Sequence, residues 1–79
     1  MNNQLTFTGC VRALERGLRF TVHYRNGDIA HYKVDARSQN YVVASAAKPR
    51  DDALMYIGER VGDSIRLTKI NQAGASPQS

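Results

Sequence analysis

The chain has 79 residues, the length of one small domain, with eleven Lys and Arg against seven Asp and Glu, a net charge of +4 and a pI near 9.6. Its single cysteine, Cys10, excludes a disulfide framework, and no apolar run approaches the roughly 20 residues that span a bilayer. The amino terminus lacks the charged and apolar segments of a secretory signal, so we expect a cytoplasmic protein without a membrane segment.

Residues 3–14 are predicted to form the first strand. Apolar side chains such as Leu5 and Phe7 fall on one face, and threonines and the cysteine fall on the other. Gly9 in mid-strand indicates a bulge or a sharp bend, as at the corner of a barrel. Residues 15–17 then turn the chain into the second strand.

Residues 18–36 carry a strong hairpin pattern, because apolar and polar residues alternate on both sides of Asn26-Gly27. A two-residue loop would mix apolar and polar side chains on each face. A three-residue loop, residues 25–27, places Phe20 opposite Tyr32 and makes one face nearly all apolar. Since a one-residue slip turns every side chain to the other face, we predict the three-residue loop, with its glycine in the left-handed conformation.

The opposite face of this hairpin is polar and basic. It has three facing pairs, which are Arg19 and Lys33, Thr21 and His31, and His23 and Ile29. Like charges directly opposite each other destabilise a sheet, so one interpretation of the Arg–Lys pair is a site that awaits an anion. The other interpretation is a solvated face whose long basic side chains splay apart and keep the protein soluble.

After this hairpin the pattern weakens. Residues 36–40 are predicted to form a polar loop. Residues 41–46 fit a strand or one turn of helix, and the β-branched Val42 and Val43 favour the strand. The tripeptide Lys48-Pro49-Arg50 ends this segment, because proline cannot donate to a ladder.

Asp51-Asp52 is suited to open a short helix, since aspartate caps free amide groups and complements the helix dipole. Leu54, Ile57 and Val61 then share a face at helical spacing, although Gly58 inside such a helix costs about 1 kcal/mol. We slightly favour this helix over the alternative, a strand that ends at Gly58.

The carboxyl-terminal part begins with a turn at Gly62-Asp63. A last strand follows over residues 64–70, with Ile65 and Leu67 on its apolar side. Residues 71–79 are small and polar and are predicted to be disordered. We therefore predict one β domain over residues 1–70.

The sequence lacks the usual catalytic and metal-binding motifs. It has no Cys-x-x-Cys and no His-Glu-x-x-His, and Gly58 and Gly62 have the wrong spacing for a phosphate loop. We therefore predict that the protein is not an enzyme and has no cofactor and no metal site.

Binding of a single-stranded nucleic acid needs cations for the phosphates and aromatic side chains for the bases. The predicted site joins the basic hairpin face to the neighbouring strand and loops: Arg12, Arg19, Thr21, His23, His31, Lys33, Arg37, Tyr41, Lys48 and Arg50. Tyr41 and Tyr56 are the aromatic residues that the predicted register does not place in the core. They are candidates for stacking on bases, or they fill the far end of a barrel with their hydroxyls at the surface.

The opening sequence MNNQLTFTGCVR has a strand pattern in which Asn3, Leu5, Gly9 and Val11 stand out. It resembles the first strand of OB-fold single-stranded DNA-binding proteins of the primosomal replication protein and small filamentous-phage types. The order of the predicted elements also resembles the OB order, although a clear fifth strand and aromatic residues on the polar face are lacking. The resemblance implies nucleic-acid binding.

Together these patterns predict a mainly β fold, a small antiparallel β-barrel or curled sheet that is OB-like or SH3-like, with at most one short helix. The predicted function is a nucleic-acid-binding module for single-stranded DNA or RNA. The alternative is a small protein-binding module or inhibitor that docks an acidic partner on the same face. A homodimer would help either function, because so short a chain buries little surface alone.

Overall fold

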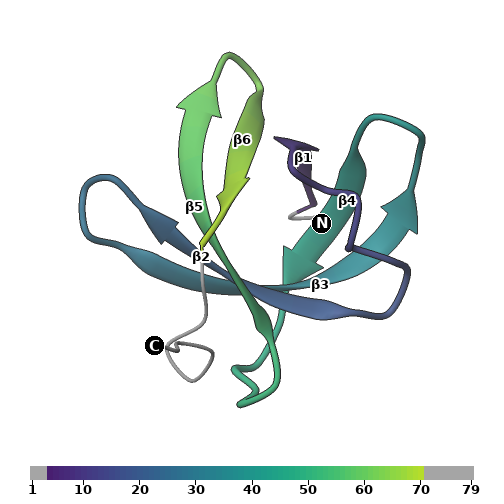
Figure 1. Ribbon diagram of the computed structural model, residues 1–79, viewed down its shortest axis with the longest axis horizontal. Coiled ribbons are helices and arrows are strands. Elements are labelled where there is room, and N and C mark those ends of the chain that lie inside the picture. Colours follow the sequence, from purple (N-terminus) through teal and green to yellow (C-terminus); the bar gives the residue numbers. More distant parts are fainter. Residues whose placement is uncertain (1–3, 71–79) are drawn as a thin grey trace, which may run out of the picture.

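Six strands form a closed barrel in the computed structural model, which describes residues 4–70 (Figure 1). The strands are β1 (Leu5–Gly9), β2 (Arg19–Tyr24), β3 (Ile29–Arg37), β4 (Val42–Ala46), β5 (Leu54–Val61) and β6 (Ser64–Lys69). Residues 4–70 contain no helix, and thus none that could cross a membrane. The prediction of a small, mainly β barrel is confirmed.

The strands follow the order β1-β4-β3-β2-β5-β6 around the barrel, and β6 returns to β1. Four neighbouring pairs are antiparallel; the β2–β5 and β1–β6 pairs are parallel. Parallel neighbours need a long connection, and here the intervening strands supply it. Because the ring closes, every strand has a partner on both sides and no edge is left open to another chain.

The β2–β3 hairpin has the predicted three-residue loop. Phe20 pairs with Tyr32 and Arg19 with Lys33, as expected from the alternation. The Tyr24 amide donates to the Asp28 carbonyl at 2.8 Å, and the loop glycine has a φ of 98°. The register that puts the apolar side chains on one face is therefore the one that forms.

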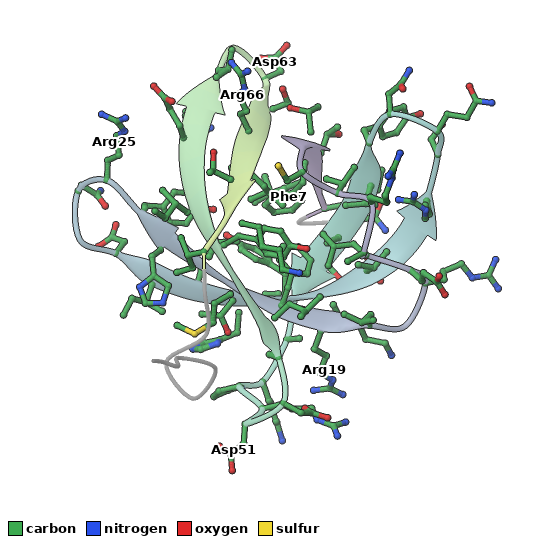
Figure 2. The ribbon with its side chains drawn as sticks, viewed as in Figure 1. Phe7, Arg19, Arg25, Asp51, Asp63 and Arg66 are labelled. Atoms are coloured by element: carbon green, nitrogen blue, oxygen red, sulfur yellow. The ribbon has the colours of Figure 1, made fainter. Side chains whose placement is uncertain are left out.

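Four aromatic rings fill the centre of the barrel. Phe7 from β1 lies edge-on to Phe20 from β2, with ring centroids 5.1 Å apart, and 4.9 Å from Tyr32 (Figure 2). Tyr56 from β5 also meets Phe20 edge-on, at 5.9 Å. Edge-to-face contacts of this kind are favourable beyond the area that they bury. The core is thus built by strands from both halves of the chain.

The first strand is shorter than predicted and ends at Gly9, where the predicted bend occurs. Gly9 has a φ of 87°, and a Cβ there would lie 2.5 Å from the carbonyl oxygen of Leu67. The chain then leaves the sheet but still contributes to the core, because Val11 and Leu14 are buried. The predicted strand over residues 3–14 is therefore half strand and half loop.

The helix predicted to open at Asp51-Asp52 is wrong, because β5 occupies that part of the chain. Tyr56 and Gly58 point inward at strand spacing, while Ile57 and Val61 are 41% and 50% exposed. The strand has a ladder on each side, parallel to β2 and antiparallel to β6. Pairing on both sides outweighs the helical spacing of its apolar residues.

Two further segments test the prediction. The segment over residues 41–46 forms β4, so the strand interpretation is confirmed. The polar loop predicted over residues 36–40 starts later, because β3 continues through an irregularity between Val34 and Ala36 and ends at Arg37. The predicted disorder of residues 71–79 lies outside the described residues.

Candidate nucleic-acid interface

Four basic residues gather where the start of β2 meets the loop between β4 and β5. We call Arg19, Lys33, Lys48 and Arg50 the basic cluster. Arg19 lies directly opposite Lys33, and its Nη1 atom donates to the Lys48 carbonyl at 3.5 Å. In Figure 2, Arg19 points toward the loop that carries Asp51. The fold therefore brings together cations from strands and from a loop.

The charge of the basic cluster is only partly neutralised. Within residues 4–70, the single ion pair joins Arg50 to Asp52, with 3.1 Å between Nε and Oδ1. Arg19 and Lys33 have no such carboxylate partner in this part of the chain. A hollow of about 220 Å³ lies between Arg19 and Arg50 and is bounded by Gly17 and Asp52. This hollow and the unpaired cations suit an anion such as a phosphate.

Three other predicted residues form a second group, which we call the loop group: Arg12, Arg37 and Tyr41. The Nη1 atom of Arg37 donates to the Val11 carbonyl at 2.9 Å, which places Arg37 beside the backbone of Arg12. Tyr41 is 42% exposed and follows the turn that starts at Ser38. Arg37 is four residues beyond Lys33 along β3, about 13 Å at regular strand spacing. The register shift between Val34 and Ala36 interrupts the alternation, and Arg37 pairs with the buried Val42, so it does not continue the face of Lys33.

Asp35 lies between these two groups on β3, and the sequence analysis did not assign it a role. Its carboxylate accepts a hydrogen bond from the Gln4 side-chain amide at 3.1 Å. Asp35 is the residue that the register with β4 skips, between Val34 and Ala36. A nucleic-acid backbone that runs from the basic cluster to the loop group would have to pass the Asp35 carboxylate.

The middle of the predicted face is less polar than expected. Thr21 is only 8% exposed, and its hydroxyl lies 3.1 Å from the Nδ1 atom of His31. His23 stands between two isoleucines, Ile29 on β3 and Ile57 on β5. We call Ile57, His23 and Ile29 the apolar row. Thr21 and His31 contact each other, and His23 belongs to an apolar strip, so these three residues are poor phosphate ligands.

The two tyrosines that were candidates for stacking on bases differ in their exposure. Tyr56 is fully buried and cannot reach a base, whereas Tyr41 is exposed. The Tyr56 hydroxyl is also buried, not at the surface as the structural alternative expected, and it has no hydrogen-bond partner among the described residues. Burial, and to a lesser degree Cys10, raises the pKa of Tyr56.

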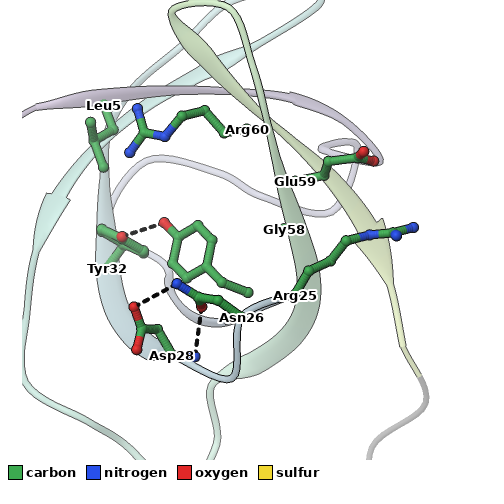
Figure 3. Close-up of a pocket in the computed structure, with 9 residues that line it drawn as sticks. Leu5, Arg25, Asn26, Asp28, Tyr32, Gly58, Glu59 and Arg60 are labelled. Atoms are coloured by element: carbon green, nitrogen blue, oxygen red, sulfur yellow. Dashed lines mark hydrogen bonds between the residues drawn. The ribbon is translucent and has the colours of Figure 1, made fainter.

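A larger pocket of about 440 Å³ opens at the end of the barrel beside the β2–β3 turn, and none of the predicted site residues lines it (Figure 3). Its wall combines Tyr24 and Tyr32 with Gly58 and Arg60. These residues come together only through the pairing of β2 with β5, which the sequence analysis did not predict. Within residues 4–70, no group of three His, Cys, Asp or Glu side chains is placed to hold a metal ion.

The chain gives no match to a protein family, to a curated protein or to a solved structure. The OB-fold itself is a five-stranded barrel, and this barrel has six strands.

Proposed function

We propose that the protein binds single-stranded nucleic acid, DNA or RNA, with the basic cluster holding the phosphates. The observation that carries this proposal is the Arg19–Lys33 pair. Two cations lie directly opposite each other on neighbouring strands without a carboxylate partner in the described residues. Such a pair repels itself, and a phosphate between the two side chains would turn this repulsion into attraction.

The residues around the Arg19–Lys33 pair support binding of a nucleic-acid chain and not of an isolated anion. Lys48 belongs to the loop that Arg19 contacts through the Lys48 backbone carbonyl, and the loop group adds Arg37 and the exposed ring of Tyr41 beyond the irregularity of β3. Stacking on an exposed aromatic ring requires a base that is free of a duplex. The resemblance of the first strand to single-stranded DNA-binding proteins points in the same direction.

The proposal is tested by titrating a fluorescent oligothymidylate of roughly 15 nucleotides, a length within the range that single barrels of this kind bind. Anisotropy is recorded at two salt concentrations for the parent and for Arg19→Ala/Lys33→Ala. We expect weaker binding and a fall of roughly 2 in the slope of log K against log salt, because two phosphate contacts are lost. An oligouridylate of equal length compares RNA with DNA.

The matched control is Arg66→Ala/Lys69→Ala, which removes the same two charges from β6. In the ring of six strands, β6 is the furthest from β3, and both of these side chains are exposed. If both double variants weaken binding equally, net charge and not the basic cluster is responsible. If the folded parent binds neither oligonucleotide at low salt, the proposal fails.

A second candidate function is the docking of an acidic protein, and the apolar row favours it. Ile29 and Ile57 are 55% and 41% exposed, and Ile29 is four residues along β3 from Lys33. Protein interfaces combine an apolar centre with a polar rim. The variant Ile29→Ser/Ile57→Ser separates the two functions. A nucleic-acid-binding protein should keep its oligonucleotide affinity, whereas loss of self-association or of partner binding in this variant would favour the protein interface.

A further inference from the structure

The pocket at the barrel end is a second concave site, separate from the basic cluster. It lies between Leu5 of β1, the β2–β3 turn and β5, and its volume of about 440 Å³ falls in the range of small-molecule sites. Tyr24 is five residues along β2 from Arg19, which places the two sites about 17 Å apart. The pocket can therefore be occupied without contact to the basic cluster.

The floor of this pocket is a pair of tyrosine hydroxyls. The oxygens of Tyr24 and Tyr32 lie 2.6 Å apart, so one hydroxyl donates to the other. The accepting hydroxyl still has a proton that it can donate into the pocket. Burial, together with the bond to Tyr32, raises the pKa of Tyr24, so its hydroxyl stays protonated at neutral pH. The floor therefore offers a hydrogen-bond donor.

A free guanidinium lies above this floor. In Figure 3, the Arg60 side chain extends from β5 toward Leu5, whereas the side chains of Glu59 and Arg25, which also line the pocket, extend to the other side. The Arg60 guanidinium has no hydrogen bond or ion pair with any residue of the described range 4–70. Its charge acts at the Tyr24 hydroxyl, where it partly offsets the upward shift of the pKa. A cation and a hydroxyl donor thus line the same pocket.

The other walls limit what the ligand can be. Leu5 is apolar, and Gly58 contributes only backbone to the wall. A Cβ at position 58 would lie 2.4 Å from Val22, so a larger residue does not fit there. Asp28, bonded to Asn26 at 3.1 Å, keeps a negative charge at the opposite rim. Glu59 adds a second carboxylate and Arg25 a second guanidinium to the lining. The two carboxylates disfavour a polyanion, whereas a single negative charge can be placed at Arg60. Leu5 and the tyrosine rings offer apolar surface to the body of a ligand.

We propose that this pocket binds a small monocarboxylate, with the carboxylate held by Arg60 and the tyrosine hydroxyl pair and the apolar body packed against Leu5. A guanidinium offers two parallel N–H groups to a carboxylate, and the hydroxyl supplies a third donor. The binding is independent of the proposed nucleic-acid site, so either can hold if the other fails.

The test is a titration of the full chain with sodium benzoate, followed by ¹H–¹⁵N NMR, with benzamide as the uncharged ligand of equal shape. A fragment of this size is expected to bind with a Kd on the order of 1–10 mM. The shifts should concentrate at the amides of Leu5, Gly58 and Arg60. Benzamide should bind about tenfold more weakly, because it cannot use the charge of Arg60.

Two variants with the same charge change complete the experiment. Arg60→Gln should weaken benzoate binding about tenfold, whereas Arg16→Gln, at an exposed position that does not line the pocket, should leave the Kd within about twofold. Both spectra must show the dispersion of the folded parent. Equal binding of benzoate and benzamide, equal losses in the two variants, or no shifts at these amides up to about 50 mM benzoate would each overturn the proposal.

Discussion

The side chain of Tyr56 packs fully buried against Phe20, yet its hydroxyl finds no partner among the described residues. A buried hydroxyl without a hydrogen bond costs about 1–3 kcal/mol of stability. We expect Tyr56→Phe to raise the free energy of unfolding by about 1 kcal/mol, because it keeps the ring and removes the unsatisfied group. Urea denaturation measures the change. Tyr41→Phe, at an exposed position, is the control and should stay within about 0.5 kcal/mol of the parent. A clear loss of stability in Tyr56→Phe would mean that the hydroxyl has a partner, such as a buried water.

Two tyrosines also predict how stability responds to alkaline pH. Burial raises the pKa of Tyr24 and of Tyr56 above the value of about 10 that an unfolded chain gives. Both therefore hold their protons in the folded state after the unfolded state has released them. The folded state is therefore stabilised fully below pH 10. Above pH 10 the free energy of unfolding falls, by up to about 1.4 kcal/mol per pH unit for each tyrosine. Urea midpoints between pH 8 and pH 11.5 should show this fall, and Tyr24→Phe/Tyr56→Phe should flatten it. An equally steep fall in the double variant would assign it to other groups.

At the scale of the strands, two glycines with similar backbone angles differ in what surrounds them. Gly9 at the end of β1 and Gly27 in the hairpin loop have φ values of 87° and 98°. An alanine at position 27 meets nothing within 4 Å, so we expect Gly27→Ala to cost about 1 kcal/mol, from backbone strain alone. An alanine at position 9 would in addition press on the Leu67 carbonyl 2.5 Å away. That contact is with the backbone of β6, which cannot rotate aside, so Gly9→Ala should cost about 3 kcal/mol or more. Thermal unfolding of both variants gives the comparison. Equal losses would show that β1 does not approach β6 this closely.

The distance in sequence between paired strands decides how much of the fold can be predicted from the sequence. The β2–β3 hairpin is local, so its alternation and its Asn-Gly loop define the register, and the opposite positions of Arg19 and Lys33 follow. β5 is different, because its neighbour β2 is remote in the chain and its exposed Ile57 and Val61 imitate a helical face. Pairing with β2 and β6 is what makes this segment a strand, and a single sequence does not show that pairing.

The parts of the candidate sites that depend on local pairing could be predicted, and those that depend on remote pairing could not. The core of the basic cluster lies within one hairpin and was predicted, whereas the hydrogen bond from Arg37 to Val11 depends on how the chain turns after Gly9. The pocket at the barrel end requires β5 beside β2, so no local pattern points to Arg60. The burial of Thr21 was missed for a related reason, since its neighbours come from β5 as well as β3.

At the scale of the whole molecule, closure of the barrel depends on the last strand. β6 joins β5 to β1, so the first and last described strands are partners although the rest of the barrel lies between them in sequence. Contacts this remote make folding slow, on the scale of milliseconds to seconds for small β proteins. They also mean that the barrel stays open until β6 pairs with β1.

Removal of β6 is therefore expected to abolish folding and not merely to weaken it. A chain that ends after Asp63 loses Ile65 and Leu67, both fully buried, and each such loss costs about 2–5 kcal/mol. It also leaves β1 and β5 with open edges. Because a small domain has only about 5–15 kcal/mol of stability, we expect no cooperative thermal transition by circular dichroism and a tendency to aggregate. The control ends after Ile70 and keeps every strand pairing of the barrel, so its Tm should match that of the full chain within a few degrees. A cooperative transition in the shorter chain would show that five strands are enough, and that β6 closes a barrel which is already stable without it.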